Sequence, residues 1–105
     1  MSNFGLKTKD VDAINKIFGQ YKTIVDVLIY GFRAMNTFRN GSDIDLTIEE
    51  NGLTFNDLTK IEIELDDLLL PYKIDLSLKK NITNASLISH IDRVGKTFYT
   101  NSKID

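Results

Sequence analysis

A nearly unbroken run of branched apolar residues constrains the fold of this chain more than any other segment. The run is IVDVLIY at residues 24–30, and Gly31 ends it. Because β-branched and aliphatic residues follow one another almost continuously, the run is typical of a central strand buried on both faces. Such a strand requires neighbouring strands for its backbone groups and further elements to cover its side chains. The run therefore predicts a sheet with helices packed on it.

Two shorter segments supply the expected neighbours of that strand. Residues 43–48 and 73–78 alternate polar and apolar side chains with a period of two, which predicts strands with one apolar face each. Helical spacing predicts helices over residues 8–21, after the N-cap Thr54 and at the C-terminus, with a short helical turn over residues 32–36. The expected fold is α/β (α+β), a small mixed sheet with helices packed on it, in one domain over residues 1–105. The C-terminal helix is marked by Leu87, Ile91, Val94 and Phe98.

The composition is that of an ordinary globular protein. Of the 105 residues, 42% are hydrophobic and 27% are charged, which is enough apolar material for a core. The formal net charge of -2 argues against direct nucleic-acid binding by bulk electrostatics, because such proteins usually carry a basic face. Cysteine is absent, which excludes disulfides and thiolate metal sites. No apolar run approaches the ~20 residues that span a bilayer, so we expect a cytoplasmic protein with no membrane partner.

Three aspartates in the predicted strands are the strongest indication of chemistry. Asp43 and Asp45 are two residues apart, so in a strand their side chains point to the same face with Cα atoms ~6.5 Å apart. Asp75 has the same context in the segment 73–78. If the two strands are neighbours, three carboxylates converge, and hard oxygen ligands of this kind suit Mg²⁺ or Mn²⁺. The pattern predicts a metal site for phosphoryl or nucleotidyl transfer.

An alternative interpretation is that the Asp-x-Asp pair lies on the solvated face of a half-exposed strand, which is the commoner origin of such a pattern. Aspartate is, however, a poor strand former, and departures from local propensity tend to fall at functional sites. The sole histidine, His90, lies off the apolar stripe of the C-terminal helix. We expect it at the surface or in an interface rather than as a catalytic base.

The segment YGFRAMNTFRNGSDIDL at residues 30–46 resembles the signature of the minimal nucleotidyltransferase (MNT) family, in the DNA polymerase β-like superfamily. The family pattern is Gly-Ser, ten residues, Asp-x-Asp, and a third carboxylate on a later strand. Here Gly31 fits the glycine, ten residues separate position 32 from Asp43, and Asp75 supplies the third acid. The resemblance implies the nucleotidyltransferase fold, catalytic and metal-binding roles for the three aspartates, and ATP or another nucleoside triphosphate as the substrate.

The same resemblance implies a nucleotide-binding segment made of Gly31, Phe32, Arg33 and Ser42. In the family the Gly-Ser turn opens a helix whose backbone N–H groups and hydroxyl hold the triphosphate, in keeping with the affinity of helix N-termini for anions. This chain departs from the pattern, because Phe32 replaces the serine and residues 35–36 are Met-Asn in place of Arg-Gly. Phe32 keeps the backbone N–H but loses the hydroxyl and adds bulk. We therefore expect nucleotide binding to be weakened more than metal binding.

Proteins that resemble this chain often act as antitoxins of a helical HEPN-family ribonuclease toxin encoded nearby. The first hypothesis is an enzyme that transfers a nucleotidyl group, AMP from ATP, to such a partner. The second is a catalytically weakened binding module of the same fold that neutralises its partner by docking. Phe32 favours the binding module, whereas the three retained carboxylates favour the enzyme. In either case we expect a stable complex, formed through apolar residues left exposed near the C-terminal helix.

Overall fold

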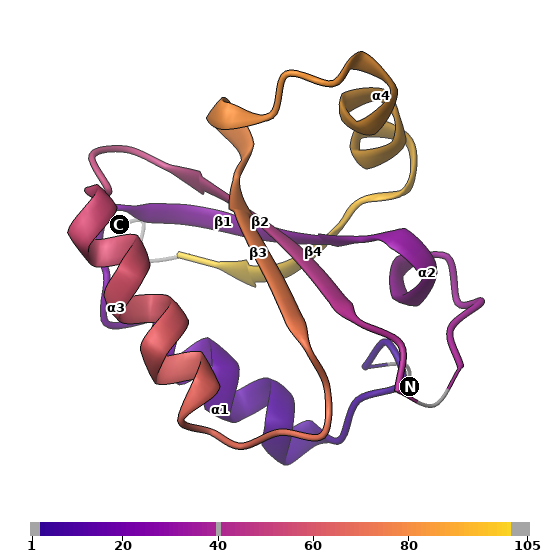
Figure 1. The fold of residues 1–105 in the computed structure, drawn as a ribbon, viewed down its shortest axis with the longest axis horizontal. Coiled ribbons are helices and arrows are strands. Elements are labelled where there is room, and N and C mark those ends of the chain that lie inside the picture. The colour runs from indigo at the N-terminus through magenta and orange to yellow at the C-terminus, as the bar shows by residue number, and fades with distance from the viewer. Residues whose placement is uncertain (1–2, 40, 102–105) are drawn as a thin grey trace.

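The computed structural model describes residues 3–39 and 41–101, so residues 1–2, 40 and 102–105 lie outside the described part. Within these ranges no helix combines the length and apolar character needed to cross a membrane. Helices and strands alternate along most of the chain (Figure 1). In order, the elements are α1 (Thr8–Phe18), β1 (Ile24–Tyr30), α2 (Gly31–Ala34), β2 (Ile44–Glu50), α3 (Phe55–Asp66), β3 (Ile74–Leu78), the 3₁₀ turn η1 (Lys79–Asn81), α4 (Ala85–Val94) and β4 (Lys96–Thr100).

Four strands form one mixed sheet in the order β3-β2-β1-β4. β1 runs antiparallel to its two neighbours, β2 and β4, while β2 and β3 are parallel. A parallel pair needs a long connection, and α3 provides it between β2 and β3. The predicted α/β architecture and the interior position of residues 24–30 in the sheet are confirmed.

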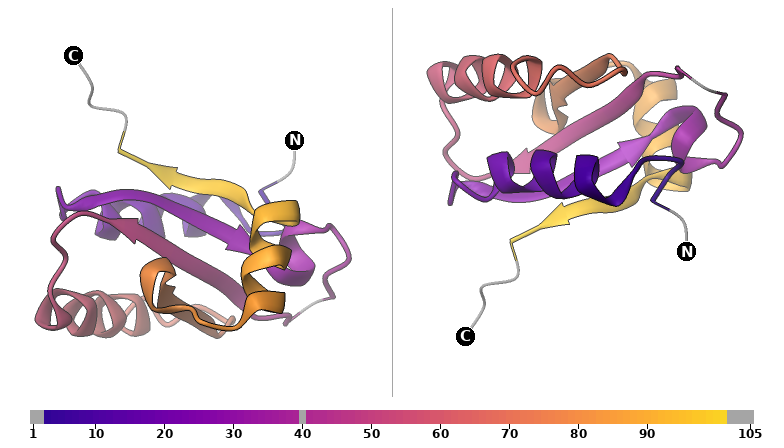
Figure 2. Two further views of the ribbon diagram at one scale, coloured as in Figure 1. Left: turned by 90° about the horizontal axis from the view of Figure 1, so that it is seen from above. Right: turned by 90° about the horizontal axis from the view of Figure 1, so that it is seen from below.

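The two faces of the sheet differ in chemistry. One face is apolar and is covered by α1 and α3, which lie on the same side of the sheet in Figure 1. Its fully buried side chains include Ile14 and Phe18 from α1, Ile61 from α3, and the register partners Ile29 and Leu46 from the sheet. α4 lies on the opposite side, where it contacts α2 and β1 (Figures 1 and 2). The sheet is therefore the middle layer between two unlike helical layers.

Side-chain caps fix the helices on either side of β3. The Thr54 hydroxyl accepts the Asp57 N–H at 3.1 Å, and the Asp57 carboxylate accepts the Thr54 N–H at 3.2 Å. This reciprocal pair is a capping box, and it starts α3 at the predicted N-cap. At α4 the Asn84 side chain accepts the Leu87 N–H at 2.9 Å. Both caps satisfy backbone donors that the first turn of a helix leaves unpaired.

The C-terminal segment differs from the prediction. The expected helix extended to Phe98, but α4 ends at Val94 and the residues Lys96–Thr100 form β4. The Gly95 N–H donates to the Ile91 carbonyl at 2.8 Å and closes the last turn, after which the chain becomes extended and pairs with β1. The four-residue spacing of Val94 and Phe98 imitates a helical stripe. The Thr, Phe and Tyr residues of β4 are instead strand-favouring, and pairing with β1 decides the conformation.

Candidate functional site

A row of polar side chains crosses the sheet on the face opposite α1 and α3. Asp45 of β2 lies in register between Tyr30 of β1 and Asp75 of β3. Because residues in register project to the same face, these three side chains are neighbours. One rung further along, the Ser77 hydroxyl donates to the Thr47 hydroxyl at 3.0 Å. The sheet thus brings Asp45 and Asp75 together on its polar face.

Asp43 lies just before β2 rather than within it, since the strand begins at Ile44. Asp43 and Asp75 are exposed, whereas Asp45 is half-buried. Burial raises the pKa of Asp45, the negative charges of Asp75 and Asp43 raise it further, and His90 acts in the opposite direction. The charges of the three aspartates therefore act on one another. We call Asp43, Asp45 and Asp75 the carboxylate row.

Gly31 brings the backbone against the carboxylate row directly after β1. Its φ is 74°, in the left-handed region that glycine adopts more easily than any other residue. A Cβ at this position would collide with Oδ2 of Asp45. The Gly31 N–H donates to Nε2 of His90 at 3.1 Å. Backbone conformation and the close approach to Asp45 both require glycine here.

His90 is the residue of this site that the sequence analysis missed. It is half-buried, accepts the Gly31 N–H, and meets the Tyr30 ring edge-on with 6.2 Å between ring centroids. Because Nε2 is the acceptor, the neutral ring carries its proton on Nδ1. Its position off the apolar stripe matters because α4 lies against the polar face of the sheet. No local sequence pattern indicates that packing.

Arg33 and Ser42, the expected phosphate contacts, are hydrogen-bonded to each other. Arg33 Nε and Nη2 donate to the Ser42 carbonyl at 3.1 and 2.9 Å, and Nη1 donates to the Phe4 carbonyl at 2.9 Å. The Ser42 hydroxyl accepts the Arg39 N–H at 2.8 Å. Only 2% of Arg33 is exposed, and burial lowers the pKa of its guanidinium. Both residues therefore restrain the loop before Asp43, and Arg33 also bonds to the N-terminal segment at Phe4. Contact of either residue with a nucleotide stays a prediction.

Phe32 of α2 and Met35, the C-cap of that helix, present apolar side chains to solvent. They are 63% and 40% exposed, so the Phe32 side chain projects into solvent rather than into the core. α2 contacts α4, and α4 carries no exposed large apolar residue of its own among the described residues. Asn36 has a φ of 62° at the position where the family pattern has glycine, and asparagine tolerates this region better than most residues. The chain thus makes a left-handed turn at Asn36.

The chemistry of the carboxylate row fits a hard divalent cation, because it offers acidic oxygens from adjacent strands. In residues 3–39 and 41–101, no three His, Asp or Glu side chains are already arranged around a common metal position. Asp43 and Asp75 are exposed, so their side chains can change rotamer without disturbing the core. Metal binding by the row stays a prediction, and the mutual repulsion of its charges is the physical reason for it.

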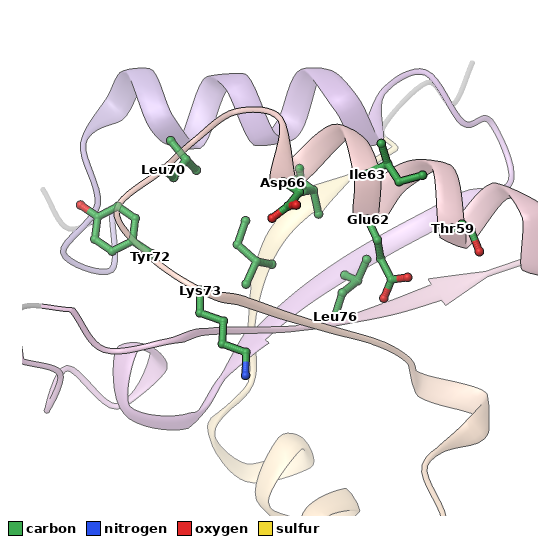
Figure 3. Close-up of a pocket in the computed structure, with 10 residues that line it drawn as sticks. Thr59, Glu62, Ile63, Asp66, Leu70, Tyr72, Lys73 and Leu76 are labelled. Atoms are coloured by element: carbon green, nitrogen blue, oxygen red, sulfur yellow. The ribbon is translucent and has the colours of Figure 1, made fainter.

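A cavity of about 420 Å³ lies away from this row, between α3 and β3 (Figure 3). Ile63 and Asp66 line it from α3, and Lys73 and Leu76 line it from the other side. Leu76 adjoins Asp75 in the strand, so the two side chains point to opposite faces of the sheet. The cavity therefore belongs to the apolar, helix-covered face and takes no part in the site around Asp45.

The fold and the site together define a nucleotidyltransferase-like class of protein: a mixed sheet with paired acids beside a glycine turn. The family described as polymerase beta nucleotidyltransferase matches residues 12–104, and this chain belongs to that family. The resemblance seen in the sequence is thereby confirmed. Among curated proteins, none matches the chain.

Several solved structures share the fold. One is a crystal structure of a toxin-antitoxin with AMP-PNP, which is 17% identical to this chain and has a TM-score of 0.68. The match covers 89% of this chain and 75% of that chain. Another is a tri-AMPylated Shewanella oneidensis HEPN toxin in complex with an MNT antitoxin, with 14% identity and a TM-score of 0.64. The match covers 93% of this chain and 76% of that chain. At these identities the likeness concerns the fold alone.

Proposed function

We propose that this chain is a Mg²⁺-dependent nucleotidyltransferase that transfers AMP from ATP to a partner protein, as the antitoxin of a HEPN-type toxin. The proposal rests mainly on Asp45 and Asp75, which lie in register on adjacent strands. The charge of Asp43 also raises the pKa of Asp45, and the Gly31 backbone lies against the Asp45 carboxylate. Two proteins of similar fold support the choice of partner and nucleotide, the toxin-antitoxin with AMP-PNP and the complex of an AMPylated HEPN toxin. A reaction that uses ATP also implies a cytoplasmic location.

The proposed reaction is a displacement at the α-phosphorus of ATP. The oxygen of an acceptor hydroxyl bonds to that phosphorus, the bond to the bridging oxygen of the β-phosphate breaks, and pyrophosphate leaves with the electron pair. Asp43 and Asp45 would hold the cation. Asp75 would either accept the hydroxyl proton or be a further ligand, in which case the proton would pass to solvent water. When bound, the cation neutralises charge on the phosphates and on the carboxylates.

Gly31 has a second role in this proposal. Its φ of 74° and the absence of a side chain allow phosphate oxygens to come close to the backbone after β1. The Gly31 N–H is hydrogen-bonded to His90, so a phosphate oxygen that uses this donor must displace the imidazole. Nucleotide binding is therefore expected to move the His90 side chain.

Labelled ATP tests the proposal. The protein is incubated with Mg²⁺, the product of the neighbouring gene, and ATP labelled at either the α- or the γ-phosphate. Label from the α-phosphate should appear on the partner, while label from the γ-phosphate should not. D45N should abolish the transfer and D12N, an exposed substitution on α1, should preserve it. Transfer of the γ-label would identify a kinase instead, and no transfer of either label would count against an enzyme.

A second candidate, the docking module, is favoured by the exposure of Phe32 and Met35 beside α4. A module of this kind neutralises its partner without chemistry, so D45N would protect cells from the partner as well as the unaltered protein does. An enzyme loses that protection with D45N. Co-expression of each variant with the partner, followed by growth measurement and co-purification, separates the two functions.

A further inference from the structure

Arg33 is the most deeply buried cation among the described residues, and its surroundings are neutral. Its guanidinium donates to the carbonyl oxygens of Ser42 and Phe4 and contacts two aromatic rings. The guanidinium carbon lies 5.1 Å from the ring centroid of Phe38 and 4.9 Å from that of Tyr72. Removing a guanidinium from water is costly unless its donors are paired and its face is covered. These contacts supply both conditions.

The partners of Arg33 come from segments that precede the carboxylate row. Ser42 is directly followed by Asp43, and Tyr72 lies three residues before Asp75. Bidentate donation to the Ser42 carbonyl restrains the first segment, and stacking on the Tyr72 ring restrains the second.

The same two segments are also joined directly. The Ile44 N–H donates to the Lys73 carbonyl at 2.8 Å, where β2 and β3 begin. This hydrogen bond sets the register in which Asp45 faces Asp75. Arg33 lies next to this junction through Ser42 and Tyr72, so its removal should disturb the entry of both strands at once.

We infer that Arg33 is a positioning residue that sets the placement of Asp43 and Asp75 in the carboxylate row, through the Ser42 carbonyl and the Tyr72 ring. The inference rests on the proposed metal site for its functional meaning. The restraint that Arg33 places on the segments before Asp43 and Asp75, which we call the clamp, can be tested without that site. The hydrogen bonds and ring contacts of Arg33 described above are all to protein groups. Arg33 acts only through the segments it holds.

A purely structural role makes a different prediction. A buried charge often contributes little net stability, and an apolar residue of similar volume can replace it without loss of folding. If Arg33 only fills space, R33M should fold and leave metal binding unchanged. If it positions the carboxylates, R33M should fold and bind metal weakly. R33K is the conservative variant, since it keeps the charge but loses the planar, bidentate donation.

The experiment measures Mn²⁺ affinity by electron paramagnetic resonance for the unaltered protein, R33K, R33M and the control I61V. Ile61 is fully buried in α3 on the apolar face, so I61V lowers stability without touching either loop. Changes behind metal ligands typically weaken metal affinity by roughly 10–100-fold, and we expect that loss in R33M, with a smaller loss in R33K. I61V should bind Mn²⁺ as the unaltered protein does.

Amide hydrogen exchange provides the second readout. The N–H groups of Ser42, Arg39 and Ile44 are hydrogen-bonded at this junction and should exchange faster in both Arg33 variants but not in I61V. Unchanged Mn²⁺ affinity in R33M would overturn the inference. If the unaltered protein binds no Mn²⁺, the proposed metal site fails, and exchange alone decides the clamp: faster exchange supports it and unchanged exchange overturns it.

Discussion

Asp45 and Asp75 are in register on adjacent parallel strands, so two acidic side chains lie side by side on one face of the sheet. Asp45 is the more buried of the two, and both burial and the charge of Asp75 raise its pKa. Like charges in direct cross-strand positions are destabilising. The free protein therefore carries an electrostatic penalty that a bound cation would remove, and this penalty is measurable in several ways.

Metal binding should raise the stability of the protein. A ligand that binds only the folded state adds about 2.7 kcal/mol to the free energy of unfolding at a concentration one hundred times its Kd. We expect Mg²⁺ or Mn²⁺ to raise Tm in a concentration-dependent way, and D45N to abolish the increase. D12N should keep it, because Asp12 is exposed on α1, away from the row. Equal increases in D45N and D12N would show that the cations act elsewhere.

The raised pKa of Asp45 gives stability a particular pH dependence in the absence of metal. The folded state holds the Asp45 proton at pH values where the unfolded chain, with an ordinary pKa of 3.8, has lost it. The contribution to stability is full below that value and is lost as pH rises through the raised pKa. Urea unfolding in EDTA from about pH 4 upward should therefore show a smaller decline for D45N than for the unaltered protein. Parallel curves would contradict the burial argument.

Gly31 and Gly41 form a matched pair for testing the approach of the backbone to Asp45. Both have positive φ, 74° and 83°, but a Cβ collides with Asp45 at Gly31 and meets nothing within 4 Å at Gly41. The left-handed conformation should cost each alanine variant about 1–2 kcal/mol of unfolding free energy. G31A should lose more, together with the increase in Tm caused by Mn²⁺, whereas G41A should keep that increase. If urea unfolding shows that G31A and G41A lose the same unfolding free energy, the Asp45 side chain moves away from the added Cβ without affecting stability.

The sequence predicts β1, β2 and β3 because their patterns are local, whereas β4 lies in a segment whose spacing imitates a helix. Residues 24–30 are continuous in apolar character, and residues 43–48 alternate, so both were assigned from neighbouring positions alone. The register of Asp45 with Asp75 is not local, because it depends on the length of α3 and the turn after it. Alternation indicates which face a side chain occupies, and only the pairing of strands decides which residue lies beside it.

The roles of His90 and Arg33 were not predictable for a related reason. The contact of His90 with Gly31 joins residues 59 positions apart, through the packing of α4 on the polar face. Arg33 lies two residues after the glycine of the motif, which predicts a phosphate contact. Its protein partners Ser42 and Phe4 come from separate segments that the glycine does not indicate. A motif identifies residue types and spacing. The direction of a side chain depends on segments that the motif does not contain.

Phe32 is the position where this chain and the family pattern disagree, and its side chain is 63% exposed, outside the core. A ring over the backbone after Gly31 would exclude the phosphates, whereas a ring pointing away from it removes only the serine hydroxyl. A hydrogen bond from a hydroxyl to a charged group contributes roughly 1.5–3 kcal/mol, which corresponds to about 10- to 150-fold in affinity. We therefore expect weak ATP binding that F32S strengthens by about tenfold or more.

The control for this prediction is M35S, which removes the exposed apolar side chain at the C-cap of α2 without restoring the family hydroxyl. Calorimetric titration of ATP in saturating Mg²⁺ should give a lower Kd for F32S and an unchanged Kd for M35S. The increase in Tm caused by Mg²⁺ alone should be the same in both, because neither residue belongs to the carboxylate row. A matching gain in M35S would mean that apolar exposure, rather than the missing hydroxyl, weakens ATP binding. Identical affinity in F32S and the unaltered protein would mean that position 32 does not contact the phosphates.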